Sequence, residues 1–242
     1  MTFEIATVLA IFLAAFVQGV AGFGFALVAM PILVSTASLE VVAPLVAVTG
    51  MLTNTLLWAY YRHAFHIKTV LRLLVASLLG IPIGLLTVDY LPEGLTLVVL
   101  GLIVAGYAVY SLLSPVLPAL RKPNWAYGFG FMAGLLAGSY NIPGPPIVFY
   151  GNCQGWTPAE FKSNLTGFFW VTAIAVITGH ALGHRLTAAV GTTFLLVIPA
   201  VMLGISLGIA LAQRINAQLF RRIILLLLIG AGLQLIYAGL SR

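Results

Sequence analysis

Apolar residues fill eight long runs of this chain, and short polar connections separate them. Most runs have about twenty residues, the length of an α-helix that crosses the roughly 30 Å hydrocarbon core of a bilayer. The runs cover residues 4–34, 41–61, 69–88, 94–113, 125–150, 158–179, 186–212 and 218–240. We therefore predict an all-α polytopic membrane protein.

Two of the eight runs contain helix-breaking residues. As one helix, residues 4–34 would extend roughly 46 Å, too long for a simple crossing, and they contain a glycine-rich stretch over 19–25 and Pro31. The fifth run contains Pro143, Pro145 and Pro146, which exclude a regular helix there. Each interrupted run is followed by three further runs, so each of two halves opens with a broken or re-entrant helix. Related halves with broken helices are typical of secondary transporters.

Matching residues support two related halves. Thr49-Gly50 and Thr166-Gly167 are 117 residues apart. Three glycines of the first half recur 124 residues later: Gly80, Gly84 and Gly106 match Gly204, Gly208 and Gly230. We interpret the four-residue glycine spacing as a close helix-packing device. The predicted organisation is an N-terminal membrane repeat (1–113), a cytoplasmic connecting loop (114–124) and a C-terminal membrane repeat (125–242).

Composition and charge agree with a membrane location. Only 7% of the residues are charged, too few to cover the surface of a water-soluble domain of 242 residues. The net charge of +6 comes from Lys and Arg near segment ends, which indicates the positive-inside rule and not nucleic-acid binding. The single cysteine, Cys153, excludes an internal disulfide framework and a cysteine zinc site. We predict a multi-pass protein of the cytoplasmic (inner) membrane.

The distribution of cations distinguishes two topologies. If all eight segments cross, seven cations lie on one side and four on the other. If segments one and five are hairpins that return to their starting side, the split is nine against two, with only Arg185 and Arg242 outside. Glu4, Glu40, Asp89 and Glu93 then lie outside as well. The second topology fits the positive-inside rule better and makes the halves inverted repeats.

The two breaks are the main candidates for a binding site. Unwound backbone at membrane depth must be buried in protein or line a wet cavity. The N-termini of half-helices present free N–H groups with partial positive charge, which favour an anion. Glycines let the backbone approach an oxyanion, and polar side chains add donors. A purely structural kink is the alternative. The predicted substrate-binding residues are Gly22, Phe23, Gly24, Asn54, Gly138, Ser139, Tyr140, Asn141, Gly144, Lys162 and Asn164.

Two of these residues admit a second interpretation. Thr157-Pro158-Ala159-Glu160 predicts a capped helix start, so Lys162 lies where the helix enters the apolar layer. Lys162 either attracts the anion or extends to the interface and pairs with Glu160. Asn54 either contacts the ligand or joins helices by a hydrogen bond.

Other chemistries find little support in the sequence. His180 and His184 have the spacing of a helical metal pair, but no nearby carboxylate or cysteine completes a ligand set. No nucleophile elbow, phosphate-binding loop or pair of acidic residues within the apolar runs is present. We predict no enzymatic activity, no cofactor and no bound metal.

The residues resemble a known family. The stretch from Gln18 through Gly-Val-Ala-Gly-Phe-Gly-Phe to Pro31, the basic loop 61–72 and the stretch Ala137-Gly-Ser-Tyr-Asn-Ile-Pro-Gly-Pro-Pro146 resemble the TauE/SafE sulfite exporters, also called toluene-sulfonate uptake permeases. The likeness extends over nearly the whole chain. It implies transport, as an exporter, of sulfite, organosulfonates or related anions. Many family members carry consecutive glycines at the breaks, where this chain has Gly-Phe-Gly-Phe and Pro-Gly-Pro-Pro.

The sequence thus predicts a secondary transporter for a small anion, with its site between halves that rock to give alternating access. A passive anion channel and a metal-handling protein that uses His180 and His184 are the alternatives. The expected partners are the anionic substrate and the lipid bilayer, without nucleic acid. A monomer and a homodimer both remain open.

Overall fold

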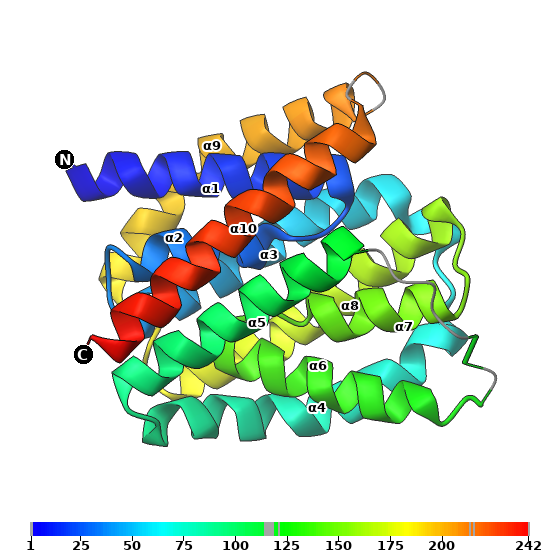
Figure 1. Cartoon of the computed structure of the whole chain (residues 1–242), viewed down its shortest axis with the longest axis horizontal. Coiled ribbons are helices and arrows are strands. Elements are labelled where there is room, and N and C mark those ends of the chain that lie inside the picture. The colour runs from blue at the N-terminus through cyan, green and yellow to red at the C-terminus, as the bar shows by residue number, and fades with distance from the viewer. Residues whose placement is uncertain (1, 114–118, 121, 213, 215, 242) are drawn as a thin grey trace.

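The chain folds into a bundle of helices, several of which lie side by side along its long axis (Figure 1). The computed structural model describes residues 2–113, 119–120, 122–212, 214 and 216–241. These residues form ten α-helices and one 3-10 helix without any β-strand, which confirms the all-α prediction. Most of the connecting loop 114–124 lies outside the described residues.

The helices of the first half are α1 (Thr2–Ala21), α2 (Phe25–Val34), α3 (Leu39–Tyr61), α4 (Ile67–Tyr90) and α5 (Glu93–Leu113), with the 3-10 helix η1 (Arg62–Ala64) before α4. Those of the second half are α6 (Trp125–Tyr140), α7 (Gly144–Cys153), α8 (Pro158–Leu182), α9 (Ala188–Leu211) and α10 (Ala217–Leu240). Within the described residues, seven helices are long and apolar enough to cross a membrane: α1, α3, α4, α5, α8, α9 and α10.

The two predicted helix breaks are present. The first run divides into α1 and α2 at residues 22–24, and the fifth divides into α6 and α7 at 141–143. In each case the shorter second helix packs against the first, so that the pair forms a hairpin (Figure 1). Both chain termini lie at the same end of the bundle. Both breaks agree with the predicted broken or re-entrant helices.

Most of the helix packing joins the two halves of the sequence. The pairs with the largest contacts are α4 with α6, α5 with α10, α1 with α9 and α3 with α8. Glycines allow the first three pairs to approach closely, because a Cβ on Gly84 or Gly101 would meet backbone of the facing helix, and Gly208 lies against Gly19. The interpretation of the spaced glycines as packing residues is confirmed at Gly80, Gly84, Gly204 and Gly208.

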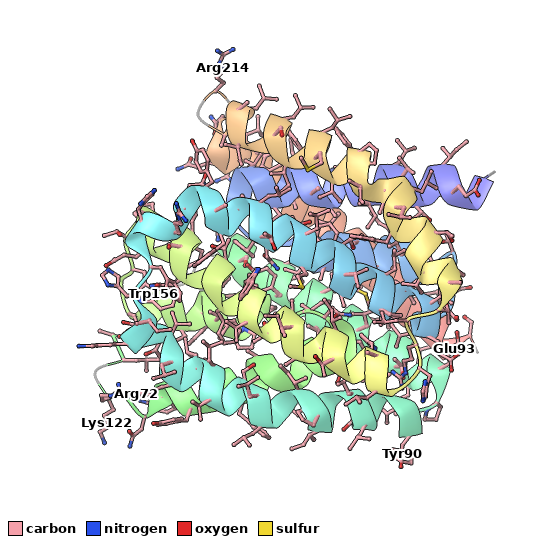
Figure 2. The ribbon with its side chains drawn as sticks, turned by 180° about the vertical axis from the view of Figure 1, so that it is seen from behind. Arg72, Tyr90, Glu93, Lys122, Trp156 and Arg214 are labelled. Carbon is pink, nitrogen blue, oxygen red and sulfur yellow. The ribbon has the colours of Figure 1, made fainter. Side chains whose placement is uncertain are left out.

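Charged residues gather at the two ends of the bundle. Arg72, Lys122 and Arg214 lie at one end, together with Trp156, whereas Glu93 lies at the other (Figure 2). Large apolar side chains such as Leu79, Leu203 and Leu226 are exposed between these ends, as expected for surfaces that face lipid.

Candidate functional site

A small cavity lies where the two helix breaks meet the middle of α3 and α8. We call it the central cavity, and its volume is about 70 Å³. That volume holds a few water molecules or one small oxyanion. The lining residues are Gln18, Gly24, Phe25, Ala26, Leu27, Val46, Ala47, Gly50, Asn54, Ala137, Asn141, Ile142, Pro143, Gly144, Phe169, Thr172, Ala173 and Val176. None of them is ionisable, although the cavity lies at membrane depth.

The start of α2 supplies the main hydrogen-bond donors of the central cavity. Residues 25–27 form its first helical turn, and the first intrahelical bond of the turn runs from the Val28 N–H to the Gly24 carbonyl. The amides of Phe25, Ala26 and Leu27 therefore have no intrahelical acceptor. No side chain caps this end of the helix. The amides and the helix dipole together give a neutral cavity partial positive charge.

The start of α7 lines the same cavity but presents fewer donors. Pro143 precedes the helix, and Gly144, Pro145 and Pro146 are its first three residues. Because proline has no N–H, only the Gly144 amide is available as a donor in this turn. A Cβ on Gly144 would make only ordinary contacts, with Phe169 and Phe23 at 3.9 Å. The second half-helix therefore contributes its dipole and one amide.

Two amide side chains from the first half complete the polar lining. The Gln18 Nε2 group donates to Asn54 Oδ1 at 2.7 Å, which joins α1 to α3. Gln18 is buried, and its Oε1 atom has no hydrogen-bond partner within the described part of the chain. Asn54 therefore joins two helices by a hydrogen bond, and it also lines the cavity in which a ligand would bind. Both interpretations of this residue are compatible with its position. The Asn54 Nδ2 group and the second N–H of Gln18 Nε2 are the side-chain amide donors of this pair that remain for a ligand.

Asn141 fixes the second break. Its backbone is left-handed, with φ of 56°, and its Nδ2 donates to the Ala43 carbonyl of α3 at 2.8 Å. Asn is one of the few residues that adopt this conformation readily. Asn141 lines the central cavity, whereas Ala43 lines a second cavity beyond it. The bond therefore closes the wall between the two cavities.

A larger cavity opens on the opposite side of the first break. This basic vestibule has a volume of about 520 Å³ and shares Gly24 and Leu27 with the central cavity. Its lining comprises Val17, Val20, Ala21, Phe23, Gly24, Leu27, Val28, Tyr107, Val148, Asn152, Trp156, Pro158, Phe161, Lys162, Ala212, Phe220, Arg221, Ile224, Leu225 and Leu228. Trp156 lies near the end that carries Arg72 and Lys122 (Figure 2).

Lys162 lies in the basic vestibule against the end of α1. Its Nζ atom is 3.5 Å from the Val20 carbonyl and 3.3 Å from the Tyr61 hydroxyl, and it lies over the Tyr61 ring. Glu160 instead contacts His66 and completes the capping box with Thr157. The capped start predicted for α8 is therefore confirmed. The ion pair between Lys162 and Glu160 is absent among the described contacts, and the ammonium group is directed toward carbonyl and hydroxyl oxygens.

Phe23 occupies the wall between the basic vestibule and the central cavity. Its ring makes edge contacts with Tyr107 and Phe161, at centroid distances of 6.3 and 6.2 Å. The ring also lies close to Gly144, which lines the central cavity. The glycines on either side, Gly22 and Gly24, have φ of 83° and 104°, a conformation that other residues rarely adopt.

A third cavity, the mixed-charge vestibule, lies at the end of the bundle that carries Glu93 (Figure 2). It has a volume of about 520 Å³, and Gly138, Ser139, Glu40, His180 and Arg185 are among its lining residues. Gly138 packs closely on α4, and the Ser139 hydroxyl donates to the Gly84 carbonyl at 3.0 Å. These two predicted site residues therefore lie on this side of the second break.

Three further predicted site residues lie outside the central cavity. Gly22 packs against the Lys162 side chain, and Tyr140 is buried in the core. The Asn164 Oδ1 atom accepts a hydrogen bond from the His66 N–H at 3.0 Å, which attaches the start of α4 to α8. Of the predicted set, the structure places Gly24, Asn54, Asn141 and Gly144 together around the central cavity.

The two histidines of the predicted pair lie in different elements. Helix α8 ends at Leu182, so His180 is within the helix and buried, whereas His184 follows it with φ of 56° and is exposed. No group of three potential metal ligands occurs among the residues that the structure describes.

Sequence reasoning missed several lining residues of the central cavity. Gln18 lies one turn before the first helix break but was not among the predicted site residues, although a polar residue at such a place is a usable signal. Phe25, Ala26 and Leu27 contribute through backbone amides, which no side-chain pattern reveals. Val46, Phe169 and Val176 line the cavity because α3 and α8 face each other there, a property of the tertiary fold.

The fold is that of a polytopic membrane protein whose two helix breaks meet at the central cavity. The family described as "Sulfite exporter TauE/SafE" matches residues 7–235, and the chain belongs to that family. It is also 27% identical over 231 residues to a protein of Cupriavidus necator named "Probable sulfite/organosulfonate exporter TauE", with coverage of 93% of this chain and 90% of that protein. No solved structure matches the chain significantly. The protein is a multi-pass protein of the cytoplasmic (inner) membrane.

Proposed function

We propose that the protein is a secondary transporter that exports a small sulfur oxyanion, sulfite or an organosulfonate, and binds it in the central cavity. The single observation that carries this proposal is the meeting of two half-helix N-termini in one uncharged cavity. The similarity to a protein named as a sulfite/organosulfonate exporter supports the substrate class.

The donors of the central cavity suffice for a desolvated anion. A hydrogen bond to a charged group contributes about 1.5–3 kcal/mol. The amides of Phe25, Ala26, Leu27 and Gly144 together would supply roughly 6–12 kcal/mol on that scale. Burial of an ion costs several kcal/mol after relaxation. Binding is therefore favourable without a lysine or arginine in the cavity, and moderate enough to permit release.

The membrane orientation follows from the charges at the ends of the bundle. The end with Arg72, Lys122 and Arg214 is the cytoplasmic one by the positive-inside rule (Figure 2). The basic vestibule then faces the cytoplasm, and the mixed-charge vestibule faces outward. Both termini lie on the outer side in this orientation.

The arrangement of helices supports inverted repeats. The offsets found in the sequence relate α4 to α9, and the two helix breaks relate α1 to α6. In the structure α1 packs on α9, and α6 packs on α4. If each helix is replaced by its counterpart in the other half, the pair α1–α9 becomes the pair α6–α4, so the two contacts are equivalent. The hairpin α1–α2 starts at one end of the bundle and α6–α7 at the other (Figure 1). Both properties are expected of halves with opposite orientation in the membrane.

Alternating access would open the central cavity to one vestibule at a time. Phe23 closes the cytoplasmic side, and the bond from Asn141 to Ala43 closes the outer side. The closely packed pairs α1–α9 and α4–α6 each consist of one helix from the first half and one helix from the second half. We therefore expect the moving bodies to be these mixed pairs, and not the sequence halves themselves.

Counterflow into liposomes tests the proposed function. Purified protein is reconstituted into vesicles loaded with unlabelled sulfite or sulfoacetate, and uptake of the same radiolabelled anion is followed. A carrier accumulates label transiently against its gradient, whereas a passive channel does not. Gly144→Phe should abolish counterflow because the ring would fill the central cavity.

Gly106→Phe is the matched control, because nothing lies within 4 Å of a Cβ at Gly106 and the position is exposed. Downhill flux without counterflow would show that the protein is a channel and not a carrier. Full counterflow in Gly144→Phe would show that the transported anion does not bind in the central cavity.

A further inference from the structure

One lysine joins the end of α1 to two other helices. The Lys162 ammonium group donates to the Val20 carbonyl at 3.5 Å and to the Tyr61 hydroxyl at 3.3 Å, and it lies over the Tyr61 ring. Val20 belongs to α1, Tyr61 to α3 and Lys162 to α8. We call these contacts the lysine tie. The tie connects the broken helix α1, which packs on α9, to the pair α3–α8.

The end of α1 favours a cation. The last carbonyl groups of a helix have no intrahelical donor and carry partial negative charge. The Gln18 carbonyl accepts from the Gly22 N–H at 2.7 Å, whereas the Val20 carbonyl accepts from Lys162. No carboxylate is among the described residues that line the basic vestibule around this contact. The lysine tie therefore depends on attraction between a full positive charge and the partial negative charge of a helix end.

Anions in the basic vestibule compete for the same ammonium group. Lys162 and Val20 both line that cavity, so an anion there can reach the tie. A hydrogen bond from an ammonium group to an oxyanion is about 2.7–2.9 Å long and roughly twice as strong as one between neutral groups. Both contacts of the lysine tie are longer, and their acceptors are uncharged. A bound anion therefore draws the ammonium group from the Val20 carbonyl and cancels the charge that attracts the end of α1.

The stem of Lys162 also packs against the first break. A Cβ on Gly22 would lie 2.8 Å from the Lys162 Cγ atom, and the next residue is Phe23, which separates the basic vestibule from the central cavity. Movement of Lys162 toward an anion removes this support from the break. A ligand shifts a conformational equilibrium only as far as it binds the two states differently. The ammonium group supplies that difference, because it is available to the anion only when α1 is released.

The second break has no charged tie of this kind. Asn141 donates to the Ala43 carbonyl at 2.8 Å, a shorter bond between neutral groups. At the offset of 117 residues between the halves, the counterpart of Lys162 is Leu45, which is buried. An anion in the mixed-charge vestibule therefore meets no equivalent lysine at the second break. Sensitivity to the anion is confined to the cytoplasmic side of the proposed orientation.

We propose that Lys162 is an anion-sensitive positioning residue, which holds the end of α1 until an anion binds its ammonium group and then releases the helix. The inference rests on the proposed function, because the released helix opens the central cavity to the cytoplasm. It makes the arriving anion itself the regulator of that opening.

The test measures the distance between α9 and α8 by pulsed electron paramagnetic resonance on the full-length protein. Spin labels are attached through Ala159→Cys and Ala210→Cys, since both residues are exposed on these helices, and Cys153→Ser removes the native thiol. We expect sulfoacetate or methanesulfonate to shift the distance by at least about 3 Å, more than a small helix shift. A distance that neither anion changes overturns the inference.

Substitutions of Lys162 distinguish the tie from general attraction of anions. Lys162→Met keeps an unbranched stem without the charge, so its distance without anion should equal the distance that sulfoacetate produces in the labelled parent. Lys162→Arg keeps a cation and should keep the anion-dependent shift. If Lys162→Met has the anion-free distance of the parent and still shifts with sulfoacetate, the inference is overturned.

Lys68→Met is the matched control. Lys68 is exposed at the start of α4 and does not line the basic vestibule, so its loss should change neither distance. Equal effects of Lys68→Met and Lys162→Met would show only a general surface potential and would overturn the assignment.

Tyr61→Phe is a milder variant that keeps the lysine and the aromatic ring. It removes the hydroxyl contact at 3.3 Å, so the tie should be weaker. The sulfoacetate concentration that gives half of the shift should fall roughly threefold, as expected for the loss of one modest hydrogen bond. An unchanged concentration contradicts the inference.

Counterflow separates this inference from the proposed function. Sulfoacetate counterflow, together with an anion-dependent shift that persists in Lys162→Met, leaves the proposed transport intact and overturns the lysine tie. A shift that requires Lys162, in a protein without counterflow of any anion, supports the lysine tie and overturns the transport proposal.

Discussion

The two helix breaks occupy related places in the sequence but differ in their chemistry. The first break contains two glycines with positive φ, Gly22 and Gly24, and leads into a helix whose first three amides are available. The second contains Asn141, bonded to α3, and leads into Gly-Pro-Pro with one available amide. The first break is therefore suited to bind and move, whereas the second forms a rigid wall. Equivalent positions in two related halves can therefore have different roles in the same binding site.

Of the substitutions that test this difference between the two breaks, that of Gly24 should have the largest effect on anion transport. Its φ of 104° strains any residue with a Cβ, by about 1–2 kcal/mol for a left-handed conformation. Gly24→Leu adds a side chain beside Val17, at a residue that lines both the central cavity and the basic vestibule, so we expect at least a hundredfold loss of sulfite or sulfonate counterflow. Gly155→Leu is the control, because Gly155 also has positive φ, of 66°, but nothing lies within 4 Å of a Cβ there. Similar losses in both variants would attribute the effect to backbone strain alone.

Asn54→Leu should have the next largest effect. It removes a donor to the anion and leaves the Gln18 Nε2 group without its acceptor. A lost hydrogen bond to a charged group costs about 1.5–3 kcal/mol, which corresponds to roughly a 10- to 150-fold weaker Kd. Anion-induced thermal stabilisation of the purified protein measures this change. Thr55→Val changes the exposed neighbour that accepts from Trp170, and it should not alter anion binding.

Asn141→Gly tests the rigid wall. Glycine adopts the left-handed conformation, so the variant removes only the hydrogen bond to Ala43. We expect the free energy of unfolding to fall by about 1 kcal/mol. The anion affinity should change less than in Asn54→Leu. Asn141→Ala should be less stable still, because alanine strains the turn. An affinity loss as large as that of Asn54→Leu would show that both breaks bind the anion equally.

Pro145→Ala should have the smallest effect, and in the opposite direction. The substitution adds an amide N–H to the first turn of α7. A favourable interaction at a helix N-terminus contributes about 0.3–1 kcal/mol, so we expect up to a fivefold tighter anion Kd. Calorimetry with the best-binding sulfonate measures it. Pro92→Ala is the control, because Pro92 precedes α5, whose start does not line the central cavity, whereas Gly144 at the start of α7 does. Weaker binding in Pro145→Ala would mean that the proline ring itself shapes the site.

The elements could be predicted from the sequence, and four of the predicted site residues line the central cavity. Lengths of apolar runs predicted the helices, and Gly22, Gly24 and Pro143 predicted where two of them break, because these residues act locally on the backbone. Gln18 and Val46 were not predicted to line a cavity, since that depends on how α1 and α3 rotate against their neighbours. Asn164 was assigned to the substrate because its type fits an anion, but its carbonyl oxygen is used to attach the start of α4.

The glycine contacts between the halves also have a consequence for biosynthesis. When α1–α5 have left the ribosome, Gly19, Gly84 and Gly101 face lipid, because Gly208, Leu135 and Gly232, which pack against them, have yet to be made. The early half of the chain therefore cannot complete its folding and must wait in the membrane for the late half. A chain stopped before α6 should be degraded. Two separately synthesised halves, divided in the loop 114–124, should find each other and restore the protein.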